Sequence, residues 1–327
     1  MPFAAGQTVG NYRIVRPLGR GGMGAVYEAV HIRLGVPYAL KAFTRGREDG
    51  GFLRDRFLAE GRMLARLSHP NLVRVYDLGV DDATGVPYFT MDLVLYRDGL
   101  PRTLADVEDG GAGEETLARW YAELAGALDY VHARGVVHRD VKLNNILLAA
   151  DRRVVLSDFG TSRFFGAEIR RALQLESTTQ ATDGERLVMG TAHYMAPEVR
   201  RGGKATPAAD YYALGMVFYR LLTGMWYEPN ETARGLLADF AFNWGDVLPR
   251  LLDEDPSRRT LLPLARVSET VAETAPARRV RRRVPAWVFA ALAALLALAA
   301  GAVLLIRSPA GAKPDFSDAF AIPESVK

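Results

Sequence analysis

One short stretch, HRDVKLNN at residues 138–145, limits the folds open to this chain more than any other feature. It carries Asp140, Lys142 and Asn145 close together, and the tripeptide DFG follows at residues 158–160. Phosphoryl transfer from ATP needs a carboxylate that orients the attacking hydroxyl, a cation near the migrating phosphate, and oxygen ligands for magnesium. We therefore expect a fold that brings both segments to one phosphate site.

The composition excludes several kinds of site. The chain of 327 residues contains no cysteine, which rules out disulfides, thiolate-bound zinc and thiol catalysis. Its net charge is +3, but five of its arginines lie in the single run 278–283. Without that run, 36 basic residues would face 38 acidic ones, so the charge predicts no face that binds nucleic acid.

An uncharged segment near the C-terminus, AWVFAALAALLALAAGAVLLI at residues 286–306, predicts a transmembrane helix. At ~1.5 Å rise per residue it matches the ~30 Å hydrocarbon core of a bilayer. The alternative is a buried core helix, but such helices rarely run so long without a polar residue. The basic linker, residues 266–285, precedes the span, so the positive-inside rule places the N-terminal part in the cytoplasm. We expect a single-pass protein of the cell membrane with a short extracytoplasmic tail at 307–327.

Hydrophobic periodicity divides the rest of the chain into two parts. Short strands are predicted at 12–16, 25–29, 38–43, 72–78 and 86–94, with one helix at 53–67. After Gly113 the period becomes helical, and one face carries Leu117, Trp120, Leu124, Leu128 and Val131. The pattern predicts an α+β fold in which a β-rich lobe, about 11–94, joins a helical lobe, about 99–265.

A glycine-rich stretch, GRGGMGAV at residues 19–26, lies between two predicted strands. Gly19, Gly21 and Gly24 let the backbone approach phosphate oxygens, because no Cβ stands in the way. The glycines alone could also open a dinucleotide-binding fold, in which a helix follows them. Here a strand follows, which favours a different type of phosphate loop.

Two charged residues are predicted to pair, although a lone lysine on a strand is usually a solvated edge residue. On the strand 38–43, Ala39 and Lys41 point to the same side. On the helix 53–67, Glu60 shares one stripe with large apolar residues, where an unpaired charge is costly. Lys41 is the natural partner for Glu60, and the alternative is that Glu60 lies in water at the edge of the stripe. Gly61 is unfavourable in a helix by ~1 kcal/mol relative to Ala, and the sequence offers no reason for it.

Residues 12–260 resemble the protein kinase superfamily through these motifs, together with YALK at 38–41, HPN at 69–71 and APE at 196–198. The glycine loop and the HPN turn most resemble those of bacterial, membrane-anchored serine/threonine kinases of the Hanks type. The resemblance implies a two-lobed kinase fold over about 11–265.

The same resemblance implies roles for the motif residues. Asp140 would orient the substrate hydroxyl, Lys142 would neutralise charge on the transferred phosphate, and Asn145 and Asp158 would bind metal. Lys41, held by Glu60, would contact the α- and β-phosphates beneath the glycine loop. The residues expected around the adenine are Val26, Ala39, Met91, Val94 and Leu147.

Other positions are expected to support this site. Glu198 would pair with Arg259, and Asp210 would cap the helix that it begins and steady the loop at 138–145. His138 and Phe159 are expected to pack rather than react. One position departs from the family, which usually has Pro where this chain has Leu143.

The implied activity is transfer of the γ-phosphate of ATP to serine or threonine of protein substrates, with Mg²⁺, or alternatively Mn²⁺, as the ion. Autophosphorylation is expected at Thr178, Thr179 or Thr182, and a homodimer is left open as a further partner beside the lipid bilayer. Two alternatives remain. A pseudokinase scaffold would bind nucleotide without phosphoryl transfer, and the intact motif residues count against it. A small-molecule phosphotransferase would lack the complete segment from DFG to APE.

Overall fold

The structure is a computed structural model that describes residues 1–20, 24–43, 57–59, 61–107, 111–159, 192–229, 235–238 and 240–267. The chain from Met1 to Val267 forms one compact unit. Among the described residues, no helix is long and apolar enough to cross a membrane. The predicted span at 286–306 lies outside the described residues, as do Gly21 and Glu60.

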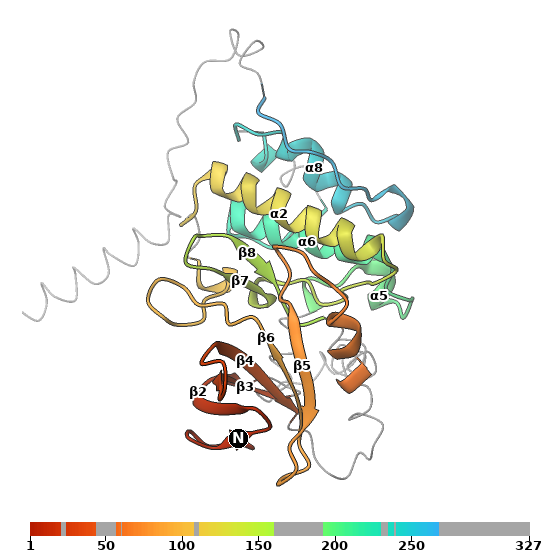
Figure 1. The fold of residues 1–327 in the computed structure, drawn as a ribbon. Coiled ribbons are helices and arrows are strands. Elements are labelled where there is room, and N and C mark those ends of the chain that lie inside the picture. Colours follow the sequence, from red (N-terminus) through yellow and green to blue (C-terminus); the bar gives the residue numbers. More distant parts are fainter. Residues whose placement is uncertain are drawn as a thin grey trace, which may run out of the picture. The chain divides into compact units, whose positions relative to one another are not determined.

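The N-terminal part forms a six-stranded antiparallel sheet (Figure 1). On β3, Ala25, Tyr27 and Ala29 are buried while the residues between them are partly exposed, because successive side chains of a strand point to opposite faces. In spatial order the strands are β1 (Thr8–Val9), β2 (Tyr12–Arg20), β3 (Gly24–His31), β4 (Pro37–Phe43), β6 (Pro87–Met91) and β5 (Val75–Val80).

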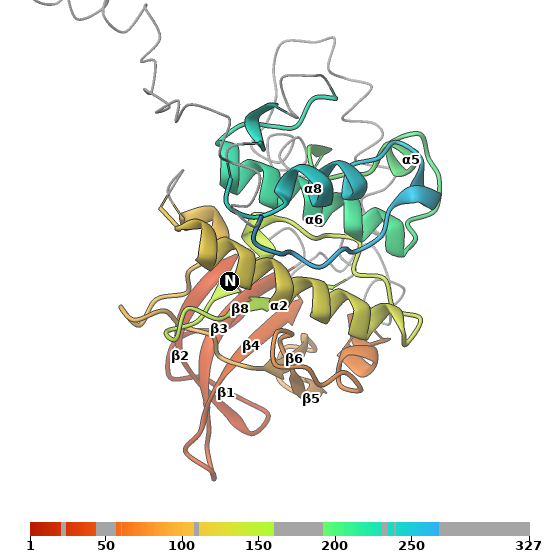
Figure 2. The ribbon, with the colours of Figure 1, turned by 90° about the horizontal axis from the view of Figure 1, so that it is seen from above.

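The C-terminal part is mainly helical (Figures 1 and 2). Helix α6 packs against both α2 and α8 and lies at the centre of this lobe. The prediction of an α+β fold with a β-rich and a helical lobe is confirmed. The regular elements of the lobe are η2 (Leu104–Asp106), α2 (Glu114–His132), η3 (Leu143–Asn145), β7 (Ile146–Leu148), β8 (Val154–Leu156), α5 (Pro197–Arg200), α6 (Pro207–Thr223), α8 (Trp244–Leu251) and η4 (Pro256–Arg258).

Sequence signals set both ends of α6. Pro207 occupies the first turn, where its missing N–H costs no hydrogen bond. Gly224 follows the last turn with φ 71°, a left-handed conformation that glycine adopts readily, and its N–H donates to Arg220 O over 2.8 Å. The stretch between is buried from Tyr212 to Tyr219, so α6 forms the core of the lobe and fixes Asp210, in its first turn, relative to the loops around it.

The strand predicted at 72–78 begins only at Val75. Leu72 instead forms a parallel bridge with Leu156 of β8, and Val73 N–H donates to Leu156 O over 3.0 Å. The residues just before β5 therefore belong to the helical lobe's hydrogen-bond network. Local periodicity carries no sign of this pairing, because the partner lies far along the sequence.

Gly61 lies in the helical stretch that packs against the sheet, and its role follows from its neighbours. A Cβ at this position would come within 2.4 Å of Leu78 Cδ1 and 3.5 Å of Phe89 Cδ1. Phe57, one turn earlier, stacks on Phe89 with ring centroids 4.9 Å apart. The glycine therefore allows the helix to approach β5 and β6 closely, which answers the question that the sequence left open.

Candidate active site

Lys41 on β4 and Asp158 after β8 join the two lobes. The ammonium group of Lys41 forms an ion pair with Asp158 Oδ1. The side chain of Lys41 is only 9% exposed and that of Asp158 is 37% exposed, so this pair lies at the mouth of the interlobe site. The sequence predicted Glu60 as the partner of Lys41. Because Glu60 lies outside the described residues, that pair stays a prediction, and Asp158 is a contact that the sequence analysis did not name.

Neighbouring charges set the pKa of Asp158, and its backbone conformation is unusual. Burial is the largest single effect on the Asp158 carboxyl and would raise its pKa. The charge and hydrogen bond of Lys41, together with the charges of Lys142 and His138, outweigh burial and hold that pKa below its ordinary value. Asp158 also has φ 59°, which is uncommon for a residue other than glycine. Both observations describe a carboxylate that is kept ionised and aimed by its surroundings.

The loop at 138–145 brings its three reactive groups together. Lys142 Nζ lies 2.9 Å from Asp140 Oδ2, and Asn145 Nδ2 donates to the same oxygen over 2.9 Å. Asn145 Nδ2 also donates to the main-chain oxygen of Asp140 over 2.8 Å. Asp140 is 7% exposed, so its carboxylate is held between a cation and an amide. Since both bonds of Asn145 use Nδ2, its Oδ1 is the atom suited to a metal ion.

His138 forms the base of the loop. It is completely buried, its ring packs on Phe159 with centroids 4.3 Å apart, and burial lowers the pKa of its imidazole. Asp140 N–H donates to His138 Nδ1 over 3.2 Å, so the ring proton is on Nε2, 3.0 Å from Ser157 O. Every ring nitrogen is thus engaged with the main chain. This matches the expectation that His138 and Phe159 pack rather than react.

Asp210 stabilises the loop in a way that the sequence analysis described only in part. Its carboxylate accepts the main-chain N–H groups of His138 and Arg139, each over 2.7 Å. It does not cap its own helix: the N-cap of α6 is Thr206, and that cap has no side-chain hydrogen bond. The expected cap was therefore wrong, because Asp210 stands a full turn inside α6 and faces the loop instead.

His132, at the end of α2, is a site residue that the sequence analysis missed. Its Nε2 lies 2.8 Å from Asp210 Oδ2, and its side chain is 7% exposed. It completes the set of donors around the buried Asp210 carboxylate. A histidine is common in the last turn of a helix, because it lies near the negative end of the helix dipole. The position of His132 in the sequence therefore did not indicate a role in the site.

Leu143, the departure from the family, has a specific contact. Its backbone interacts with the hydroxyl of Tyr194 and lowers the pKa of that group, while burial, the larger effect, raises this pKa to about 12. The tyrosine in turn packs edge-on against Trp226, with centroids 5.2 Å apart. The loop at 138–145 is thereby tied to the segment around APE.

The ion pair predicted between Glu198 and Arg259 is present. Two guanidinium nitrogens of Arg259 lie 2.8 and 2.9 Å from the two carboxylate oxygens of Glu198. The side chain of Arg259 is completely buried and also donates to Ala208 O over 3.1 Å. This bidentate pair anchors the start of α5 to the end of the lobe.

The two described glycines of the phosphate loop differ in their surroundings. A Cβ at Gly24 would meet Ala42 O at 2.3 Å, because β3 and β4 run close together there. A Cβ at Gly19 would meet nothing within 4 Å. The close approach of β3 and β4 therefore excludes a side chain at position 24. At position 19 the space next to β2 is open, so packing does not exclude one there. Gly21 lies outside the described residues.

The residues expected around the adenine come together in one hydrophobic cluster. Ala39 and Met91 are directly paired across β4 and β6 and are 4% and 9% exposed. Val26, Val94 and Leu147 are partly buried and pack against the same cluster. Their arrangement gives an apolar surface drawn from both lobes, next to Lys41, and their contact with a nucleotide stays a prediction.

The donor set fits a hard divalent cation. Asp158 supplies a carboxylate with a lowered pKa, and Asn145 supplies an amide oxygen. Mg²⁺ is usually bound by one or two carboxylates together with substrate phosphates and water. Within the described residues, there is no group of three or more His, Cys, Asp or Glu side chains that could hold a metal ion. The expected phosphorylation sites Thr178, Thr179 and Thr182 lie outside these residues.

Comparison with known proteins agrees with this geometry. The family model described as "Protein kinase domain" matches residues 12–243. Serine/threonine-protein kinase PknA of Mycobacterium tuberculosis is 36% identical over 218 residues, which are 66% of this chain and 47% of PknA. Serine/threonine-protein kinase PknF of the same organism is 34% identical over 335 residues, covering 91% of this chain and 67% of PknF.

A solved structure is also similar. The crystal structure of the Mycobacterium tuberculosis PknI kinase domain matches with a TM-score of 0.58 and 29% identity, over 79% of this chain and 94% of that one. The two-lobed arrangement is thus shared with a kinase domain. The chain spans about half the length of PknA, so what PknA does as a whole protein does not transfer directly.

Proposed function

This chain belongs to the protein kinase family, and on that premise we propose that it transfers the γ-phosphoryl group of ATP to serine or threonine of protein substrates. The observation that supports this most is the Asp140–Lys142–Asn145 cluster, with Asp140 Oδ2 2.9 Å from both partners. A pseudokinase would have no need to keep these three groups in contact.

In the proposed reaction the substrate hydroxyl oxygen attacks the γ-phosphorus. The bond between that phosphorus and the bridging oxygen breaks, its electron pair leaves with ADP, and the hydroxyl proton goes to Asp140. Lys142, held against Asp140, offsets the negative charge of the transferred group. The α- and β-phosphates of ATP compete with Asp158 for the ammonium group of Lys41. On ATP binding, Lys41 therefore contacts the phosphates and either keeps or loses its ion pair with Asp158.

A divalent cation, Mg²⁺ or alternatively Mn²⁺, would be held by Asn145 and Asp158 and would neutralise phosphate charge. Asp158 is prepared for this role because Lys41 keeps its carboxyl ionised. We also propose that residues 286–306 anchor the chain in the cell membrane with the kinase domain in the cytoplasm, on the basis of the apolar span and the arginine run before it.

The test uses the full-length chain in mild detergent with γ-labelled ATP and Mg²⁺, beside Asp158→Asn. We expect label on serine or threonine, found by phosphoamino-acid analysis, in the wild type only. Mass spectrometry then maps the label, and the expected positions are Thr178, Thr179 or Thr182. Bound ATP without any label, or label on tyrosine alone, would overturn the proposal, and the first result would favour a scaffold.

A further inference from the structure

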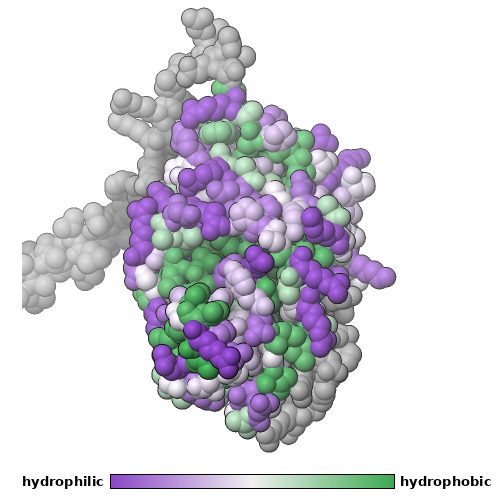
Figure 3. Space-filling view, in the orientation of Figure 1, coloured by the Kyte–Doolittle hydropathy of each residue, from purple (hydrophilic) through white to green (hydrophobic). Residues whose placement is uncertain are grey.

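A pocket of about 360 Å³ opens between the lobes, apart from the site described above. Its walls come from residues 68–70, from Leu72 and Arg74 before β5, from the interlobe segment 92–95, and from the β7–β8 hairpin. Only Val94 is shared with the expected adenine site. Figure 3, drawn from the same side as Figure 1, shows hydrophobic side chains near the middle of this face, between α2 and the N-terminal sheet.

The pocket carries one arginine from each lobe. Arg74 is exposed, and its guanidinium carbon lies 5.4 Å from the centroid of the Tyr76 ring. Among the described residues, no carboxylate or carbonyl accepts a hydrogen bond from that guanidinium. Arg153 lies on the opposite wall, where it donates to Pro70 O and lies 3.6 Å from Asp151. Both cations therefore border the same cavity.

Asp92, the one acidic lining residue, has both carboxylate oxygens hydrogen-bonded. Asp92 Oδ2 accepts the main-chain N–H of Arg74 over 2.9 Å, and its Oδ1 accepts the Tyr76 hydroxyl over 2.7 Å. The Asp92 bond raises the pKa of Tyr76 to about 12, so Tyr76 stays a donor. His69, another lining residue, has a pKa lowered by burial and is neutral at pH 7. The lining residues thus hold two arginines and one carboxylate, a net charge of +1, and the Asp151 carboxylate beside Arg153 is not itself a lining residue.

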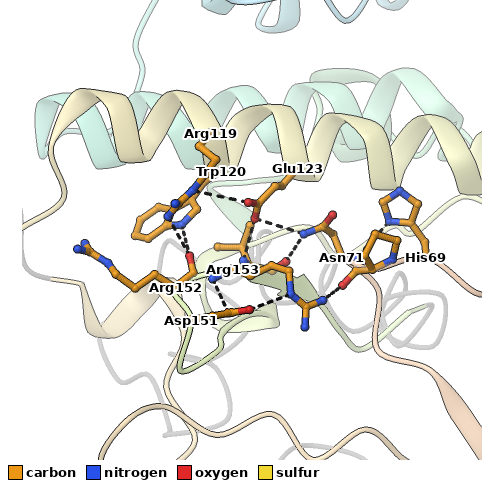
Figure 4. Close-up of polar contacts among 10 residues, drawn as sticks. His69, Asn71, Arg119, Trp120, Glu123, Asp151, Arg152 and Arg153 are labelled. Atoms are coloured by element: carbon orange, nitrogen blue, oxygen red, sulfur yellow. Dashed lines mark hydrogen bonds and ion pairs between the residues drawn. The ribbon is translucent and has the colours of Figure 1, made fainter.

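The floor of the pocket is apolar, and its walls are fixed. Leu72 and Val155 are 3% and 2% exposed. Figure 4 shows the network behind them: Asn71 Nδ2 donates to Val154 O over 2.8 Å and to Glu123 Oε2 over 3.2 Å. Glu123 also accepts the N–H of Val154 over 3.0 Å. This network joins residues 69–71 to α2 and β8, so the cavity is formed before any ligand arrives.

We propose that this pocket is a docking site for an acidic peptide segment of a partner protein. A carboxylate of the peptide contacts Arg74 and Arg153, and a neighbouring apolar side chain contacts Leu72 and Val155. Charge complementarity selects the acidic partner, because the lining residues carry more arginines than carboxylates and, among the described residues, the Arg74 guanidinium bonds to no carboxylate or carbonyl. Exposed arginine and tyrosine side chains beside a buried apolar floor are the residue types that dominate protein-binding surfaces. This inference concerns binding alone and does not depend on catalysis.

The test is a selection of random short peptides, displayed on phage, against the immobilised full-length chain in mild detergent. The enriched peptides are then synthesised with a fluorescent label and measured by anisotropy against the wild type and Arg74→Glu. We expect enriched sequences with Asp or Glu next to an aliphatic or aromatic residue, and binding at least roughly tenfold weaker to Arg74→Glu, a change of about 1.4 kcal/mol. Saturating ATP should leave the peptide bound.

Arg33→Glu is the matched control, because it makes the same charge change in the exposed turn between β3 and β4. It should bind the peptide within about twofold of the wild type, well below the tenfold step of 1.4 kcal/mol. If Arg74→Glu shows a lowered melting temperature, Arg74→Gln replaces it. Enrichment without acidic residues, equal binding to both variants, or complete displacement by ATP would each overturn the docking site.

Discussion

Glu198 and Arg259 form a bidentate ion pair in which the arginine side chain is completely buried. Removing one partner of such a pair leaves the other charge without compensation in a dry environment. We therefore predict that Arg259→Ala lowers the free energy of unfolding by about 3–5 kcal/mol, measured by urea denaturation of the full-length chain.

The control for this prediction is the ion pair between Arg266 and Glu115, with a distance of 2.9 Å and side chains 64% and 69% exposed. Water screens this pair, so Arg266→Ala should cost no more than about 1 kcal/mol. Equal losses in the two variants would contradict the assignment of Glu198–Arg259 as the anchor of α5.

His138 gives a prediction about pH. Burial lowers the pKa of its imidazole below the ordinary value of 6.5, outweighing the nearby charges of Asp210 and Asp140. As the pH falls, the His138 imidazole is therefore protonated in the unfolded chain before it is protonated in the folded chain. The contribution of neutral His138 to the free energy of unfolding is fully present above pH 6.5 and is lost as the pH falls from there toward the folded-state pKa. His138→Phe removes this proton uptake.

The measurement is the free energy of unfolding of both proteins across mildly acidic pH. The slope should be smaller in His138→Phe but not zero, because burial also lowers the pKa of His69. His138→Phe also loses hydrogen bonds to the main chain, so its absolute stability is the less informative quantity. Identical slopes would show that His138 is accessible to protons in the folded state.

Two helical glycines are predicted to respond to alanine with opposite signs. At Gly126, in α2, a Cβ would meet nothing within 4 Å, so Gly126→Ala should stabilise the protein by up to ~1 kcal/mol through helix propensity. At Gly61 the Cβ would come within 2.4 Å of Leu78 Cδ1, so Gly61→Ala should destabilise by about 1–3 kcal/mol. Thermal unfolding of the two variants tests this packing role of Gly61.

The sequence predicted those parts of the site that motifs specify through residue type and spacing. The two lobes, the loop at 138–145 and the Glu198–Arg259 pair follow from patterns that are visible along the chain. The contacts that it missed depend on partners far away in sequence. His132 and Gly61 acquire their roles only when α6 and the sheet are packed against them, and local periodicity cannot report that.

Backbone groups were the other source of misses. Asp210 faces the main-chain N–H groups of His138 and Arg139 rather than the start of its own helix. Leu143 interacts with the Tyr194 hydroxyl through its backbone, which no side-chain pattern describes. The late start of β5 has the same origin, because Val73 and Leu72 pair with Leu156 through the main chain.

The most direct test of the central claim compares ATP binding with phosphoryl transfer in Asp140→Asn. Asparagine keeps the size of the side chain and its contact with Lys142 and Asn145, but it cannot accept the hydroxyl proton. Binding of ATP, measured by calorimetry on the full-length chain, should stay unchanged, while the rate of transfer from labelled ATP should fall by about 10²–10⁴-fold. A transfer rate equal to that of the wild type, with binding intact, would contradict the role of Asp140 and with it the proposed reaction.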